Sequence, residues 1–158
     1  MTLDDMELSI YQGEKGIKNA LALIEAYIDK KKLSDDKVSN ITKLTKQIKL
    51  KLSETPVHFF NQLVVTERYR NYIKEVIEAY KSSGNDRIEN TTEASKKVLG
   101  VAESDSNKRI LAAKEPETKR NREIEKNEIF KVFKRISFLT NLFDIYNLLY
   151  DVKTEING

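Results

Sequence analysis

The longest apolar-periodic stretch of the chain lies near its C-terminal end, at residues 124–152. Large apolar side chains recur there three and four residues apart, which places them on one face of an α-helix. Two adjoining seams result, and together they are wider than the apolar stripe of a surface helix. We therefore predict a long C-terminal core helix that contacts at least two neighbours. The first seam holds Ile129, Val132, Ile136, Leu139, Phe143, Tyr146 and Tyr150, and the second Phe138, Leu142, Ile145, Leu149 and Val152.

The same segment is too polar for a bilayer. Its dense apolar part is about 15 residues long, whereas a membrane-spanning helix needs about 20 mostly apolar residues. Asn141, Asp144 and Asn147 fall inside this part. We therefore expect no membrane span.

Residues 3–29 carry apolar or small residues at two heptad positions over four heptads, which predicts one long first helix. Gly13 and Gly16 lie in its middle. Such small residues permit the close approach of another helix, and glycine also weakens a helix enough to mark a bend. Both interpretations stay open at this point.

Two further helices are predicted between residues 35 and 82. Ser34 and the acidic pair after it are suited to cap a helix over 35–53. Pro56 suits the first turn of a helix over 56–82, which ends at a turn around Gly84. Residues 84–107 have few apolar side chains, so we expect a weakly ordered connector with a short helix near 87–102. The expected fold is a single all-α domain over 1–158, a bundle of about four main helices.

Catalytic and metal-binding groups are scarce. The chain has no cysteine and one histidine, His58. Glu54 and His58 are four residues apart, but Pro56 lies between them and no third ligand is evident, so we expect no metal site and no cofactor. A Ser-His-Asp triad would need His58 as its base, and its neighbours Phe59 and Phe60 favour a packing role instead. We expect a protein that is not an enzyme.

The net charge is only +3, but the cations are concentrated in two blocks, at residues 37–51 and 108–135. Basic residues on one helix flank can bind the phosphates of a nucleic acid, and they can equally form a solvated surface. In the second block glutamates alternate with the cations, a pattern typical of paired charges on a solvated helix. A further small patch surrounds Tyr69, which is either a base-stacking platform or a half-buried side chain. The candidate residues for binding a polyanion or partner are Lys43, Lys46, Lys49, Arg68, Arg70, Lys108, Arg109, Lys119, Arg120, Arg122, Lys126, Lys131, Lys134 and Arg135.

These patterns favour a small, non-enzymatic helical adaptor that acts through protein–protein contacts or self-association, within a larger assembly. The alternative is a nucleic-acid-binding accessory protein that uses the two basic faces. The acidic N-terminal segment lacks the basic and apolar regions of a secretory signal, so we expect a cytoplasmic location.

Overall fold

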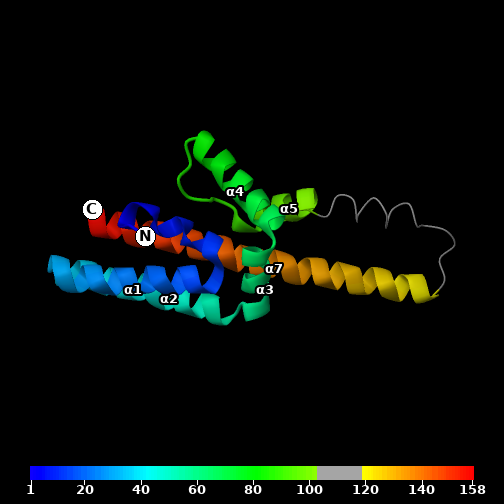
Figure 1. The fold of residues 1–158 in the computed structure, drawn as a ribbon, viewed down its shortest axis with the longest axis horizontal. Helices are drawn as coiled ribbons and strands as arrows, with labels where there is room; N and C mark the ends of the chain where they lie inside the picture. Colours follow the sequence, from blue (N-terminus) through cyan, green and yellow to red (C-terminus); the bar gives the residue numbers. More distant parts are fainter. Residues whose placement is uncertain (103–118) are drawn as a thin grey trace.

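The computed structural model describes the backbone of residues 1–102 and 119–158, and within these ranges the side chains of 1–62, 66–67, 69–100 and 133–158. The described part is all-α, as predicted, and contains no strand. Figure 1 shows the helices arranged around the long C-terminal helix. In chain order they are η1 (Leu3–Gln12), α1 (Gly13–Lys31), α2 (Asp35–Ser53), α3 (Val57–Val65), α4 (Glu67–Ser82), α5 (Thr91–Ala102) and α7 (Lys119–Asn157).

The prediction of one continuous helix over residues 3–29 is wrong. Residues 3–12 form a 3-10 helix, η1, and the chain then folds back into α1, so that the two elements lie side by side. Gly13 has a positive φ of 70°, a conformation that glycine adopts at little cost. Gly16 permits a close approach, because a Cβ added there would lie 2.1 Å from the backbone oxygen of Ser9. Gly13 thus marks the bend, and Gly16 the close contact.

The three-residue turn of η1 explains which of its side chains are buried. A 3-10 helix has three residues per turn, so residues three apart share a face. Leu3, Met6 and Ser9 form one buried column at this spacing, and Glu7 and Ile10 form a second. A carboxylate is thereby placed inside the protein next to apolar neighbours.

The second helix is confirmed at its predicted bounds, as α2. Its N-cap is Ser34, whose hydroxyl accepts a hydrogen bond from the backbone N–H of Lys37 at 3.4 Å. Ile41 and Ile48 are its buried residues. Because this buried stripe is narrow, most of the α2 surface is left to solvent.

The third predicted helix is in fact two helices. α3 and α4 meet at Thr66, whose φ and ψ of −93° and 91° are extended and interrupt the helix. No glycine or proline marks this break in the sequence. Figure 1 shows α4 leaving α3 at an angle and rising away from α7.

The weakly apolar region after α4 contains the predicted short helix, which is α5. Ile88 in the preceding loop is buried, as are Ala94, Val98 and Leu99 of α5, and α5 contacts both α7 and α4. Residues 84–100 are therefore more closely packed than their apolar content indicated. Residues 103–107 of the predicted connector lie outside the described residues.

The long C-terminal helix is the core helix, as predicted. It contacts η1, α2 and α5. Its buried side chains include Leu139, Phe143, Tyr146 and Leu149, which belong to both predicted seams. The seam residues Ile129 and Val132 lie outside the described side chains. Within the described residues, no helix is both long and apolar enough to cross a membrane.

Candidate functional site

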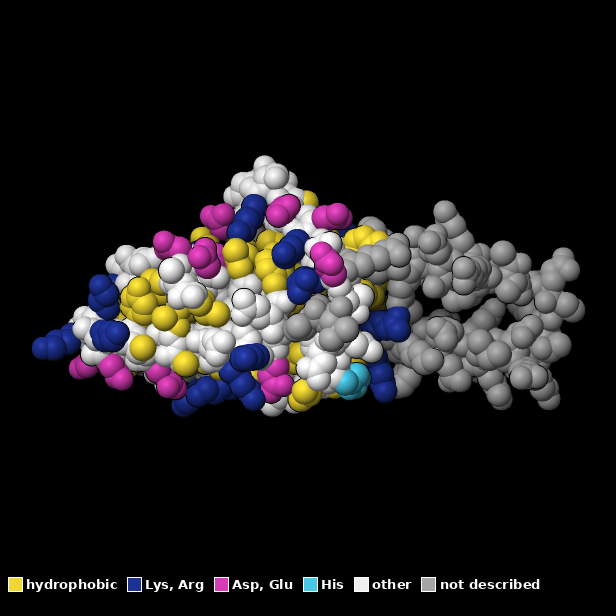
Figure 2. All heavy atoms as spheres, in the orientation of Figure 1, with side chains coloured by type: hydrophobic (Ala, Val, Ile, Leu, Met, Phe, Trp, Pro, Cys, Tyr) yellow, Lys and Arg dark blue, Asp and Glu magenta, His cyan; other side chains and the backbone are white. Residues whose placement is uncertain are grey.

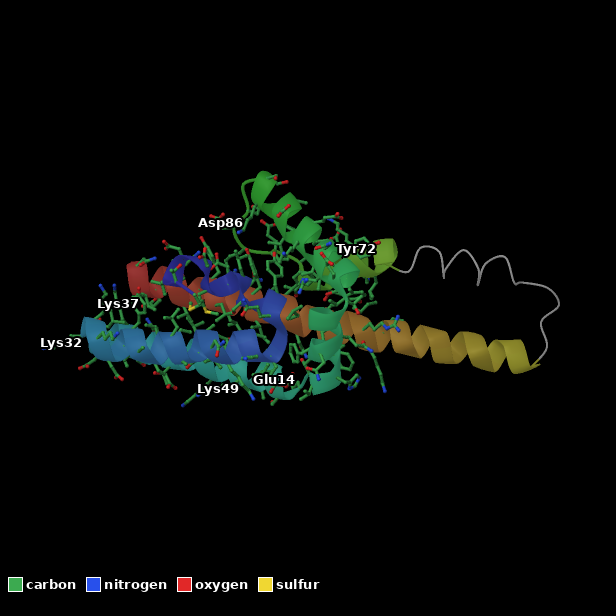
Figure 3. The ribbon with its side chains drawn as sticks, in the orientation of Figure 1. Glu14, Lys32, Lys37, Lys49, Tyr72 and Asp86 are labelled. Carbon is green, nitrogen blue, oxygen red and sulfur yellow. The ribbon has the colours of Figure 1, made fainter. Side chains whose placement is uncertain are left out.

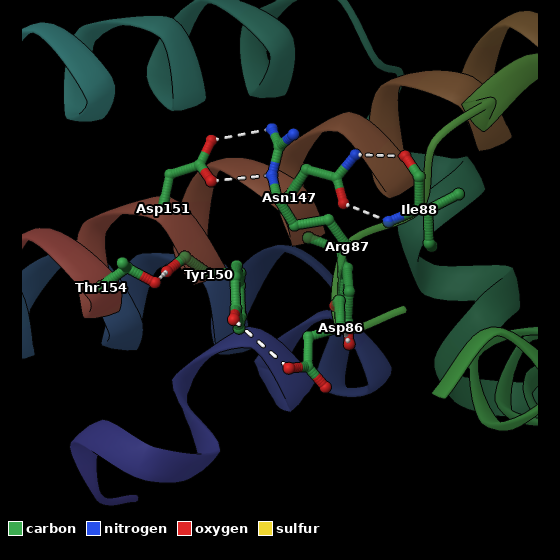
Figure 4. A network of polar contacts seen from close by, with 8 residues as sticks. Asp86, Arg87, Ile88, Asn147, Tyr150, Asp151 and Thr154 are labelled. Carbon is green, nitrogen blue, oxygen red and sulfur yellow. Dashed lines mark hydrogen bonds and ion pairs between the residues drawn. The ribbon is translucent and has the colours of Figure 1, made fainter. Parts of the chain in front are cut away.

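The loop between α4 and α5 is attached to α7 by a set of polar contacts (Figure 4). The buried side-chain amide of Asn147 accepts a hydrogen bond from the N–H of Ile88 and donates one to its carbonyl oxygen, both at 2.9 Å. Beside it, Arg87 forms a two-pronged contact with Asp151 at 2.8 and 2.9 Å. These contacts fix the position of the next residue back in the loop, Asp86.

Asp86 faces two tyrosines of α7. The hydroxyl of Tyr150 donates to a carboxylate oxygen of Asp86, and the hydroxyl of Tyr146 donates to its backbone oxygen, both at 3.5 Å. Hydrogen bonds of this length are weak. Burial, and then the negative charge of Glu7, raise the pKa of Tyr146 well above its ordinary value. Tyr146 therefore stays protonated and remains a hydrogen-bond donor at any physiological pH.

A buried ion pair joins η1 to the end of α7. The ammonium of Lys153 lies 2.7 Å from Oε1 of Glu7, and their side chains are 17% and 5% exposed. Lys153 also donates to the backbone oxygen of Asp4 at 3.4 Å and lies 5.0 Å from the centre of the Tyr150 ring. Among the described residues, Oε2 of Glu7 has no hydrogen-bond partner although it is buried. The carboxylate is thus paired on one side only.

These groups line a surface pocket of about 490 Å³, which we call the η1–α7 pocket. It is lined by Tyr146 and Tyr150 of α7, by both residues of the Glu7–Lys153 ion pair, and by Lys81 of α4 with Asp86 of the following loop. Its volume lies in the range of about 300–1,000 Å³ that is typical of small-molecule sites, but its lining is more polar than the mostly apolar lining of such sites. The full lining is Glu7, Lys81, Asp86, Tyr146, Tyr150, Lys153, Thr154, Asn157 and Gly158.

No lining residue belongs to the predicted candidate set. Sequence patterns missed this pocket because its charged residues come from distant segments, with Glu7 and Lys153 lying 146 positions apart. The described residues contain no cluster of three or more residues able to hold a metal ion. His58 is exposed in the first turn of α3, so the packing role expected for it is wrong.

The predicted lysines of α2 form a separate surface, which we call the α2 lysine face. Lys43, Lys46 and Lys49 are all exposed, and none of them forms an ion pair within the described part of the chain. In contrast, Lys51 on the same helix lies 3.4 Å from Asp144 of α7 and faces inward. Figure 3 places Lys49 and Asp86 on opposite sides of the molecule. Figure 2 shows acidic side chains among the basic ones along the lower edge of the molecule in this view.

The other predicted cations are only partly described. Arg70 is half-buried, Lys134 and Arg135 are exposed, and each of the three interacts with another residue. Tyr69 is half-buried rather than free on the surface, and the positive charge of Arg135 acts on its hydroxyl, so the structure brings these two candidate regions together. The side chains of Arg68, Lys119, Arg120, Arg122, Lys126 and Lys131, and the whole of Lys108 and Arg109, lie outside the described residues.

Comparison with protein-family models, with curated proteins and with solved structures found no match for this chain. The structure therefore assigns the protein to a structural class only, that of all-α helical bundles, with a long C-terminal helix at its core.

Proposed function

We propose that the protein is a non-enzymatic helical adaptor that binds a protein partner through the part of α7 that extends beyond the bundle. The observation that supports this proposal is the length of α7. Its 39 residues span about 58 Å at 1.5 Å per residue. Leu139 is the first buried residue among the α7 side chains described, and Figure 1 shows the earlier part of the helix continuing past the other helices.

A large apolar side chain is exposed where α7 leaves the bundle. Phe133 is 63% exposed and is followed by two exposed cations, Lys134 and Arg135. Aromatic side chains and arginine are enriched in the contact residues that dominate protein–protein binding. A partner that covers Phe133 would remove its ring from water, which is worth about 1.5–3 kcal/mol.

Affinity capture from the native host, repeated with nuclease, tests this proposal. We expect the full chain to retain a protein partner after nuclease treatment, or to self-associate in light scattering. Phe133→Asp should abolish that association. The matched control is Leu50→Asp, because Leu50 is 58% exposed on α2, outside the proposed contact. A monomer that captures nothing, or a Phe133→Asp variant that still binds, would contradict the proposal.

The alternative is an accessory protein that binds nucleic acid through the α2 lysine face. It is supported by the exposure of Lys43, Lys46 and Lys49 and by their lack of ion pairs within the described residues. Three neutralised phosphates contribute about 2.7 to the slope of log affinity against log salt for duplex DNA. Replacing all three lysines with glutamate should remove binding in fluorescence anisotropy at low salt.

The matched control for that experiment reverses three other exposed lysines, Lys15, Lys81 and Lys96, which lie on α1, α4 and α5. It changes the net charge equally but leaves α2 intact. If both triple variants lose binding to the same extent, only overall charge matters. If the wild-type chain does not bind at low salt, the alternative fails.

A further inference from the structure

The η1–α7 pocket has hydrogen-bonding capacity that the protein itself does not use. Oε2 of Glu7 is buried without a partner among the described residues, while Oε1 is held by Lys153. A carboxylate accepts hydrogen bonds on both oxygens and donates none. An unmade bond at a buried charged group costs free energy. Oε2 is shielded from solvent, so a donor in the pocket reaches the unpaired side of the carboxylate once the Glu7 carboxylate turns.

The second carboxylate of the pocket is also under-used. Asp86 is exposed, and among the described residues its carboxylate accepts only the long hydrogen bond from the hydroxyl of Tyr150, while the hydroxyl of Tyr146 donates to its backbone oxygen. Each tyrosine has a single hydrogen to donate, and both are directed at Asp86. Lys153 is engaged by Glu7 and Asp4. The unused hydrogen-bonding capacity of the two carboxylates is therefore capacity to accept.

The pocket already binds one ammonium group, that of Lys153, through a carboxylate and an aromatic ring, and these groups can bind a second cation in the same way. Lys153 lies 5.0 Å from the centre of the Tyr150 ring and 2.7 Å from the Glu7 carboxylate. Aromatic faces and carboxylates both attract cations. Lys81 is the other cation that lines the pocket, and its side chain is exposed at the rim, free to turn away into solvent.

We propose that the η1–α7 pocket binds an organic cation that carries an ammonium or guanidinium group. The cation donates to Asp86 and to Glu7, whose carboxylate turns about its last, soft torsion to share its oxygens between Lys153 and the ligand. The aliphatic part of the ligand lies against the ring of Tyr150, because the ring of Tyr146 is buried and only 1% of that residue is exposed. The volume of about 490 Å³ accommodates one small molecule or one long side chain.

The same chemistry has two sources, a free small amine or an arginine side chain of another protein. Isothermal titration of the full chain with agmatine tests the first source, and titration with an acetylated, amidated Gly-Arg-Gly peptide tests the second. We expect saturable one-to-one binding of at least one probe. Saturation by agmatine alone assigns a free ligand, saturation by the peptide alone assigns a protein side chain, and saturation by both supports the site with either source.

Asp86→Asn is the main variant, because an exposed residue can be changed with little risk to folding. It should weaken binding by about tenfold, which corresponds to about 1.4 kcal/mol. Asp36→Asn, at an exposed position in the first turn of α2, is the matched control and should bind like the wild type. Glu7→Gln should also weaken binding, provided that its thermal unfolding shows a folded protein. Absence of saturation with both probes, or equal affinity in Asp86→Asn and Asp36→Asn, would overturn the proposal.

Discussion

The α2 lysine face and the η1–α7 pocket are both built from charged residues, but the charges lie in opposite environments. Lys43, Lys46 and Lys49 extend into solvent and form no ion pairs within the described residues. Across the molecule, Glu7 and Lys153 are enclosed between η1 and α7 at 2.7 Å. The two sites should therefore respond differently to mutation: changes to the exposed lysines of α2 should leave stability unchanged, and changes to the buried ion pair of the pocket should lower it.

The largest effect should come from breaking the buried ion pair. Lys153→Met leaves the Glu7 carboxylate buried without its counter-charge, which typically costs about 3–5 kcal/mol. Urea unfolding measures this loss. The control is Lys46→Met on α2, which should change the free energy of unfolding by no more than about 0.5 kcal/mol, because that side chain is exposed. Equal losses of stability in the two variants would contradict the distinction between the η1–α7 pocket and the α2 lysine face.

Breaking the contact between the α4–α5 loop and α7 should cause the next largest loss of stability. Asn147→Ala leaves both the N–H and the carbonyl of the buried Ile88 without their partner, and we expect a loss of about 2–4 kcal/mol in unfolding free energy. Asn40 offers a matched control, because its amide donates to Glu155 at an exposed position. Asn40→Ala should cost about 0.5 kcal/mol or less. An Asn147→Ala variant as stable as Asn40→Ala would show that the loop does not depend on this contact.

The packing of η1 against α1 depends on the missing side chain at Gly16. A Cβ there would meet the Ser9 oxygen at 2.1 Å and the Gln12 Cβ at 2.7 Å, so Gly16→Ala should lower the free energy of unfolding by about 1–3 kcal/mol. Gly100 is its control, because no atom of the described residues lies within 4 Å of a Cβ added at that position of α5. Gly100→Ala should stabilise the protein by about 0.5–1 kcal/mol in thermal unfolding. Destabilisation by both changes would instead indicate a general intolerance of added side chains.

The smallest effect concerns a buried hydroxyl. Burial raises the pKa of Tyr69 from 10.0 to about 12, against the lowering effect of Arg135. Between these pH values the unfolded chain has lost the proton that the folded chain keeps, so stability falls as pH rises through this window and is unaffected below it. The hydroxyl has no hydrogen-bond partner among the described residues, so Tyr69→Phe should change stability at neutral pH by less than about 1 kcal/mol.

The same variant should show a shallower loss of stability between pH 10 and 12 than the wild type, measured by urea unfolding at each pH. The pH dependence of the Lys46→Met variant serves as the reference, since that side chain is exposed on α2. A Tyr69→Phe profile that overlays the wild-type profile would contradict the assignment of this titration to Tyr69.

Sequence periodicity predicted the elements whose structure depends on local spacing. α2 has its cap at Ser34 and its buried stripe at Ile41 and Ile48 where the pattern placed them, and α7 buries most described residues of both predicted seams. It failed at Gly13, because a heptad pattern cannot distinguish a continuous helix from two elements that fold back on each other. The exposure of the α2 lysines was predicted correctly, because charged residues on one flank of an amphipathic helix normally lie in solvent.

The pocket could not be predicted in the same way. Its ion pair and its amide contact join residues 146 and 59 positions apart, and no local pattern specifies such pairs. Glu7 would be taken for a surface residue because it is charged, but in η1 it lies in a buried column with Ile10, three residues further on. Asp86 likewise gains its role from the turn at Gly84, which has a positive φ of 84°, and from the contacts of the loop with α7.

A double-mutant cycle on Glu7 and Lys153, followed by urea unfolding, tests the contrast between buried and solvated charges most directly. The reference is the same cycle on Glu14 and Lys18, which are 2.8 Å apart on α1 with Lys18 63% exposed. We predict a coupling energy of about 1–3 kcal/mol for the buried pair and about 0.5 kcal/mol or less for the exposed pair. Equal coupling energies in the two cycles would contradict the enclosed ion pair on which the description of the η1–α7 pocket depends.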